Sequence, residues 1–174
     1  FSLTGINLPT TLKSIGDLAF TECSEIKTMY IPINCQEIGK GAFCLTASLT
    51  EFTVNNLNQY FVAIDGVLYN KNKTTLIAYP SKKADKSFDV PDSVKNIADY
   101  AFYGADLLES VNMFGVENIG AEAFSDCSLL AAVNLSLTLE TIGENAFVNC
   151  PKIRRIGIPD SVLSIGEHAI GYEY

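Results

Sequence analysis

The residues in this chain that could perform chemistry are its cysteines, its single histidine and its carboxylates. His168 stands beside Glu167, and a Cys–His nucleophile pair would need a thiol such as that of Cys150 brought to it from elsewhere in the chain. The five cysteines include no C-x-x-C pair, which excludes the usual zinc and thioredoxin spacings. They are Cys23, Cys35, Cys44, Cys127 and Cys150. Because their number is odd they cannot all pair internally, and we expect them to pack as small hydrophobic side chains.

The carboxylates do not gather at one point of the sequence. Asp92, Asp126 and Asp160 stand at positions typical of turns and helix starts. A row of acids along neighbouring repeats could bind Ca²⁺, but no repeat column is consistently acidic. The 12 glycines contain no G-x-G-x-x-G run that would cradle a phosphate. We therefore expect no catalytic residues, no metal and no cofactor.

Length, composition and charge bound the class of protein. The 174 residues favour one domain, 1–174, and the missing initiator Met and abrupt C-terminus favour a segment of a longer protein. An apolar content of 48% argues against disorder. The 12 basic and 20 acidic residues give a net charge of −8, which disfavours nucleic-acid binding. No apolar run approaches the ~20 residues of a membrane span, so we expect no membrane insertion.

The elements that would position these residues belong to an internal repeat. Its anchor is the dipeptide Ile-Gly, which recurs about every 23 residues apart from one longer gap. The anchors are Ile15-Gly16, Ile38-Gly39, Ile119-Gly120, Ile142-Gly143 and Ile165-Gly166, with Ile97-Ala98 in a sixth copy. An Ala-aromatic pair follows at Ala19-Phe20, Ala42-Phe43, Ala101-Phe102, Ala123-Phe124 and Ala146-Phe147, and Ala169-Ile170 closes the series. An apolar-Pro pair precedes the anchor at Leu8-Pro9, Ile31-Pro32, Val90-Pro91 and Ile158-Pro159.

Each column of the repeat predicts a piece of one coil. The alternating apolar residues before Pro predict a short strand with one buried face, which Pro ends because it has no N–H. The Gly predicts a tight corner; since Ala98 shares the slot, close backbone approach explains it better than a left-handed conformation. Ala-Phe predicts a short helical turn with Phe between coils. Stacked together, such units predict an α/β solenoid of about seven 22–23-residue coils with a narrow parallel sheet.

Residues 60–88 interrupt the repeat and predict a β-meander. Runs at 60–64, 67–69 and 75–80 are rich in strand-forming residues, and Asp65-Gly66 is a turn signal between the first two. Residues 71–86 hold five lysines and one acid, Asp85. Two interpretations remain open: a solvated edge that discourages aggregation, or a basic patch for an anionic polysaccharide or acidic protein. The patch would consist of Lys71, Lys73, Lys82 and Lys83.

The repeat resembles a known family. Residues 158–170 (Ile-Pro-Asp-Ser-Val-Leu-Ser-Ile-Gly-Glu-His-Ala-Ile) together with 146–150 (Ala-Phe-Val-Asn-Cys) resemble the BspA-type leucine-rich repeat of bacterial and some protozoan surface proteins. Segments 65–70 and 75–80 are similar to the hairpin that interrupts repeats in that family. Departures are Phe114-Gly115 and Ser136 in place of Pro, and Ile170 in place of Phe.

The resemblance implies a leucine-rich-repeat protein that is secreted or on the cell surface, although no signal peptide is visible in this sequence. It also implies adhesion or the binding of host proteins, and no catalytic residues.

The strand face is where a curved solenoid usually binds its partner. We expect a protein-binding face formed by Tyr30, Asn112, Asn134 and Arg155. Its partner would be a host matrix or cell-surface protein; a glycan is the other possibility, although the face lacks an aromatic row. The alternative is a structural spacer that presents other domains and has no ligand of its own.

Overall fold

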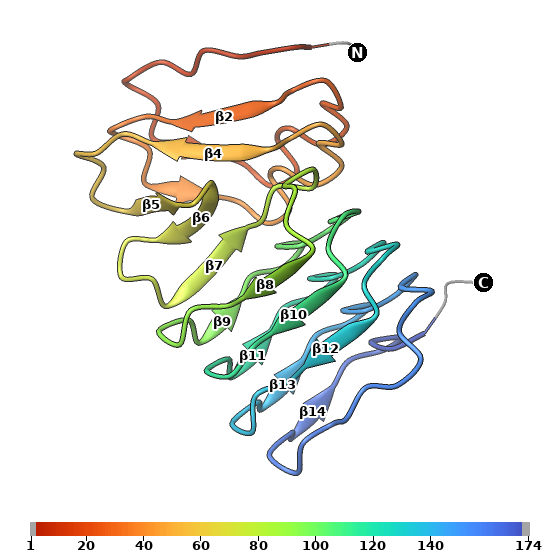
Figure 1. Ribbon diagram of the computed structural model, residues 1–174. Coiled ribbons are helices and arrows are strands. Elements are labelled where there is room, and N and C mark those ends of the chain that lie inside the picture. The colour runs from red at the N-terminus through yellow and green to blue at the C-terminus, as the bar shows by residue number, and fades with distance from the viewer. Residues whose placement is uncertain (1–2, 172–174) are drawn as a thin grey trace.

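The computed structural model describes residues 3–171, which contain fourteen short strands and no helix. The chain winds as a solenoid of about seven coils, whose strands stand in two rows (Figure 1). Row A contains β2 (Thr28–Ile31), β4 (Glu51–Val54), β8 (Ser87–Asp89), β10 (Ser110–Asn112) and β12 (Ala132–Asn134). Row B contains β1 (Ser14–Ile15), β3 (Glu37–Ile38), β7 (Thr75–Ala78), β9 (Asn96–Ile97), β11 (Asn118–Ile119), β13 (Thr141–Ile142) and β14 (Ser164–Ile165). The other two strands, β5 (Phe61–Ile64) and β6 (Val67–Asn70), form an antiparallel hairpin.

Neighbouring coils pair in parallel within each row, but the rows are not continuous. Row B from β14 to β7 joins the hairpin in one seven-stranded sheet, with the order β14-β13-β11-β9-β7-β6-β5. β1–β3 and β2–β4 are separate two-stranded sheets, and β8, β10 and β12 form a three-stranded one. The hairpin thus divides the solenoid into an N-terminal block (β1–β4) and a C-terminal block (β7–β14), as Figure 1 shows.

Row A confirms the strands expected before Pro. In β2 the exposed side chains of Thr28 and Tyr30 alternate with buried Met29 and Ile31, and the strand ends at the residue before Pro32. Row B was not expected. The Ile of the anchor lies in a strand rather than at a tight corner, because successive Ile-Gly segments hydrogen-bond to one another from coil to coil.

The glycine of the anchor is explained by close approach, as predicted. A Cβ added at Gly143 would lie 2.4 Å from the backbone nitrogen of Ala121 in the preceding coil, and at Gly166 it would lie 2.4 Å from that of Glu144. Gly16 lies in the first coil of the described chain, and a Cβ there would meet nothing within 4 Å. The close spacing of coils therefore requires Gly inside the stack, whereas nothing in the described structure requires it at Gly16.

The prediction of short helical turns at Ala-Phe was wrong. A left-handed residue precedes the Ala of each predicted Ala-Phe pair, for example Glu122 at φ 52° and Asn145 at φ 54°. A second one follows four positions later, at Asp126 and Asn149. Right-handed runs are too short for a helix, and alternate N–H groups instead donate to the next coil, as Phe124 N does to the carbonyl of Ala146 at 2.8 Å. We call this third side of the solenoid the turn face.

The meander was predicted correctly, but part of it belongs to the repeat. Asp65 and Gly66 both have positive φ, as a two-residue hairpin turn requires. Ala78-Tyr79 fills the Ala-aromatic column, since Tyr79 N donates to the carbonyl of Ala101 at 2.7 Å just as Phe102 N donates to that of Ala123. The sequence analysis did not place Ala78-Tyr79 in this column.

Two hydrophobic cores meet at β6. Leu68 packs in the core of the N-terminal block, whereas Val67 and Tyr69 pack in that of the C-terminal block. All three side chains are buried, so the strand separates the two cores. Burial raises the pKa of Tyr69 to about 12, and its hydroxyl stays neutral between the blocks.

Candidate interaction surface

A ladder of polar side chains runs along the C-terminal part of row A. Asn112 of β10 stands in register with Asp89 of β8 and Asn134 of β12. The Asn112 amide donates to the Asp89 carboxylate at 2.6 Å, and the Asn134 amide donates to the Asn112 side-chain oxygen at 2.6 Å. Val111, one position away on β10, is fully buried. Alternation along a strand therefore turns the ladder outward, where its amides can contact a partner.

Two exposed apolar side chains lie at the corner between row A and row B, next to this ladder. Phe114 is 65% exposed and Leu137 is 84% exposed. Phe114 holds the position that Pro91 and Pro159 hold in other coils. The exposure of the Phe114 ring shows that it points out of the solenoid, so it can form a surface contact instead of a core contact.

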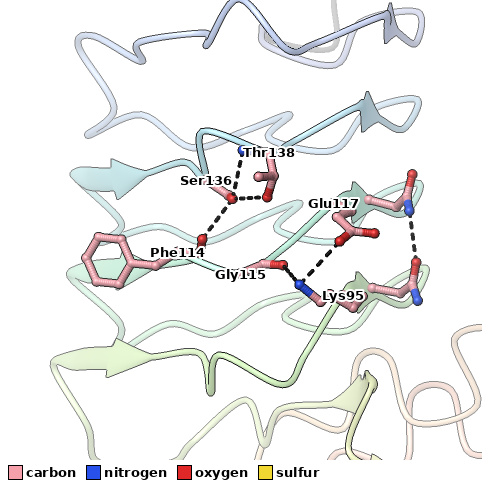
Figure 2. Close-up of polar contacts among 8 residues, drawn as sticks. Lys95, Phe114, Gly115, Glu117, Ser136 and Thr138 are labelled. Atoms are coloured by element: carbon pink, nitrogen blue, oxygen red, sulfur yellow. Dashed lines mark hydrogen bonds and ion pairs between the residues drawn. The ribbon is translucent and has the colours of Figure 1, made fainter.

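Hydrogen bonds fix the backbone of this corner (Figure 2). Ser136 Oγ donates to the carbonyl of Phe114 at 2.9 Å and accepts from Thr138 N at 3.1 Å. On the other side, Lys95 Nζ donates to the carbonyl of Gly115 at 3.2 Å and pairs with Glu117 at 3.2 Å. Figure 2 shows the Phe114 ring directed away from these contacts. The corner is therefore preorganised while the ring stays free.

A shallow hollow of about 600 Å³ adjoins Phe114. It is lined by Phe114, Val133, Asn134, Leu135, Leu137, Thr138 and Gly157. An apolar concavity with a few polar groups at its edge is typical of a site that accepts an apolar side chain of another protein. We call the hollow, with Phe114, Leu137 and Asn134, the corner patch.

The structure brings together only part of the predicted binding face. Asn112 and Asn134 are adjacent in the ladder. Tyr30 lies in β2 of the other block, 44% exposed, and its hydroxyl accepts a hydrogen bond from Asn55. Arg155 is exposed in the segment between β13 and β14, outside the strands. Sequence reasoning missed Phe114 and Leu137 as contact residues, although Phe114 and Ser136 were visible as departures from the Pro column.

The lysines of the predicted basic patch are separated. Lys71 and Lys73 precede β7, whereas Lys82 and Lys83 follow it. Lys82 pairs with Asp106 at 2.7 Å and Lys83 with Asp85 at 2.9 Å. Lys71 donates to the carbonyl of Asn58. Two of the four charges are thus matched by carboxylates.

The groups considered for catalysis lie apart in the described chain. His168 is exposed in a turn, whereas Cys150 is buried and its thiol donates to the carbonyl of Phe124 at 3.0 Å. Burial raises the pKa of the Cys44 and Cys127 thiols, which keeps them protonated. Within residues 3–171, no group of three His, Cys, Asp or Glu side chains could hold a metal ion. The same residues contain no helix long and apolar enough to cross a membrane.

A family described as the BspA type leucine rich repeat region matches residues 1–75 and 78–173, and it matches in six copies. No curated protein sequence matches the chain.

Solved structures of bacterial leucine-rich repeat proteins are similar to the chain. The pneumococcal vaccine antigen PcpA is 34% identical with a TM-score of 0.88, over 92% of this chain and 40% of its own. A leucine rich cell surface protein from Faecalibacterium prausnitzii is 31% identical with a TM-score of 0.90, over 98% of this chain and 45% of its own. A leucine-rich repeat protein from Eubacterium ventriosum, 24% identical with a TM-score of 0.65 over 93% of this chain and 62% of its own, shares the fold. The chain thus spans less than half the length of the first two.

Proposed function

The chain belongs to the BspA-type leucine-rich repeat family, and from this premise we propose that it is a non-enzymatic recognition module on a bacterial cell surface. It binds a protein of a host or neighbouring cell through the corner patch and the adjoining Asn112–Asn134 ladder. The observation that carries the proposal is the exposure of Phe114 and Leu137, 65% and 84%, at a corner that hydrogen bonds hold fixed.

The surface location is supported by the similar structures, one of which is described as a cell surface protein and another as a vaccine antigen. Those descriptions apply to the two proteins themselves. They support extracellular exposure of this chain, where a protein-binding face would meet its partner.

The chemistry of the corner patch suits a protein partner. Aromatic side chains that enter a pocket of the partner account for much of the affinity of protein interfaces, and exposed amides add hydrogen bonds at the rim. A glycan platform would need several aromatic rings in a row, and the corner patch offers Phe114 alone. The family is described as a repeat region, which is in keeping with a protein-interaction scaffold.

The experiment is a binding assay with the double variant Phe114→Ala/Leu137→Ala. The probes are purified extracellular-matrix proteins and intact epithelial cells, with Leu163→Ala as control because Leu163 is 80% exposed but does not line the hollow. We expect the double variant to lose affinity by roughly tenfold or more, and the control to bind as the parent does. Both variants should keep the melting temperature, since the removed side chains are exposed. Equal binding by the double variant would overturn the proposal, and no binding by the parent protein would favour the spacer.

A further inference from the structure

The last coil of the described chain is joined to its neighbour on two sides of the solenoid and separated from it on the third. On row B, Gly166 N donates to the carbonyl of Ile142 at 2.8 Å, and on the turn face Phe147 N donates to that of Ala169 at 2.8 Å. Row A, however, ends at β12 (Figure 1). Within the described chain, no backbone hydrogen bond joins residues 153–158 to β12. The stack therefore opens on row A between β12 and this segment.

The hollow of the corner patch occupies this opening. It is lined on one side by β12 and the corner that follows, and on the other side by Gly157. Residues 153–158 keep the orientation of a row A strand, because Ile153 and Ile156 pack against the core of the C-terminal block. Arg155, like Gly157, is exposed. Two residues of chain span at most about 7 Å, so the Arg155 side chain starts close to the edge of the hollow.

Three of the chain's basic residues gather in this segment. Lys152, Arg154 and Arg155 stand within four residues of one another, and all three are exposed. Among the described residues, five lysines form an ion pair with a carboxylate, whereas none of these three cations does. The chain as a whole carries a net charge of −8. Unpaired positive charge is thus concentrated beside the hollow, where it is available to an anionic partner.

The first coil shows that the opening and the charge are separate features. Its described residues also contribute no strand to row A, but the corresponding segment, 3–8, contains no charged side chain. The acid that follows the cations in the last coil is Asp160, which stands at the corner in the position that Leu137 holds one coil earlier. A carboxylate of a partner would therefore be attracted to the row A side of the hollow and repelled from the corner side.

We propose that the corner patch receives an acidic segment of the partner protein, an inference that rests on the proposed function. An apolar side chain of that segment enters the hollow, and a neighbouring carboxylate pairs with Arg154 or Arg155. A guanidinium group suits this role because its planar N–H donors bind a carboxylate through two parallel hydrogen bonds. A sulfated glycan would match the charge but leave the apolar hollow unfilled, so the combination favours a protein segment.

The first test is an NMR titration of the ¹⁵N-labelled protein with acetyl-Glu-Phe-Glu-Leu-Glu-amide, and with the same peptide carrying Gln in place of Glu. We expect the amide signals of Val133, Leu137 and Gly157 to shift, and the acidic peptide to bind about tenfold or more tightly than the neutral one. The difference should shrink at roughly 0.5 M NaCl, because salt screens exposed charges. The absence of shifts at these amides at millimolar peptide, or equal binding of both peptides, would overturn the proposal.

Charge variants locate the effect. The variant Lys152→Gln/Arg154→Gln/Arg155→Gln should bind the acidic peptide as weakly as the parent binds the neutral one. The matched control removes the same amount of charge from exposed lysines that form no ion pair in the part of the chain that the structure describes. This control is Lys13→Gln/Lys27→Gln/Lys73→Gln. It should bind as the parent does, and equal weakening by the control would assign the effect to net charge and overturn the proposal.

Failure of this proposal can be told apart from failure of the proposed function. If Phe114→Ala/Leu137→Ala loses binding to matrix proteins while Lys152→Gln/Arg154→Gln/Arg155→Gln keeps it, the corner patch binds protein without selecting an acidic segment, and only the present proposal fails. If the double variant keeps its binding, both fail. A heparin oligosaccharide that binds more tightly than the acidic peptide, and equally well to the double variant, would point to a glycan and overturn the acidic segment.

Discussion

The two blocks are built from the same repeat, yet only the C-terminal block stacks without interruption. Its aromatic column runs through Tyr79, Phe102, Phe124 and Phe147, with ring centroids 4.8, 4.5 and 5.1 Å apart. In the N-terminal block a single stacked pair, Phe20 and Phe43, is seen among the described residues, at 5.7 Å. Phe43 then meets Phe52 edge-on, because the hairpin stands where the next coil would be.

This difference indicates that the burial of a coil's side chains depends on its neighbouring coils more than on its own sequence. Phe124 lies between two stacked rings and is fully buried, whereas Phe20 in the first described coil is half-buried. Both occupy the same column of the repeat. In a solenoid the interface between coils supplies most of the burial, so the same residue contributes more in the middle of a stack than at its end.

The largest expected effect is the difference between Phe124→Ala and Phe20→Ala in the loss of free energy of unfolding. Removing the buried Phe124 ring should lower the free energy of unfolding by about 3–5 kcal/mol, since it leaves a cavity between two stacked rings. Phe20→Ala should cost less than ~2 kcal/mol, because part of that ring is already in water. Urea unfolding measures both values. Equal costs would mean that the position in the stack does not matter.

A smaller effect should come from the glycines of the anchor. Gly143→Ala should lower the free energy of unfolding by roughly 1–3 kcal/mol, because the new Cβ would press on the backbone of Ala121 and force the coils apart. Gly16→Ala, in the first coil, should stay within about 0.5 kcal/mol of the parent. Thermal unfolding of the two variants gives the comparison. A destabilised Gly16→Ala would point to a backbone conformation, rather than coil spacing, as the reason for glycine.

Much of the fold could be predicted from the repeat columns. Strands that alternate buried and exposed residues and end at Pro, the close approach at Gly and the meander all rest on local, periodic signals. The turn face could not be predicted this way. Left-handed residues such as Glu122 and Tyr100 are types that disfavour this conformation by roughly 1–2 kcal/mol, so nothing in their identity signals it. They adopt it because hydrogen bonds to the next coil offset the cost, and those bonds exist only in the stack.

The candidate site was predictable only in part, for a related reason. Asn112 and Asn134 recur at the same position of adjacent repeats, so their spacing placed them on one face. Phe114 and Leu137 are single substitutions in the Pro-containing corner, and an isolated apolar residue has no period that separates surface from core. Their exposure depends on how the corner orients these two side chains, which the sequence pattern does not predict.

The smallest expected effect concerns the polar ladder, which spans three strands of the C-terminal block. Asn112→Ala removes one hydrogen bond to Asp89 and one from Asn134, both on the surface, and should cost about 1 kcal/mol. Tyr30→Phe is the matched change in the N-terminal block, since the Tyr30 hydroxyl takes part in one exposed bond, from Asn55. We expect Tyr30→Phe to stay within about 0.5 kcal/mol of the parent, measured by urea unfolding.

Amide hydrogen exchange would then show how far this loss reaches. If the ladder helps to hold row A together, Asn112→Ala should speed exchange in both β8 and β12, because Asn112 is the member bonded to each neighbour. Exchange in β2 and β4 should not change, since these strands belong to a separate sheet on the other side of the hairpin. Faster exchange in both blocks would mean that β6 couples them into one cooperative unit, and the contrast between the blocks would then be one of packing and not of independent stability.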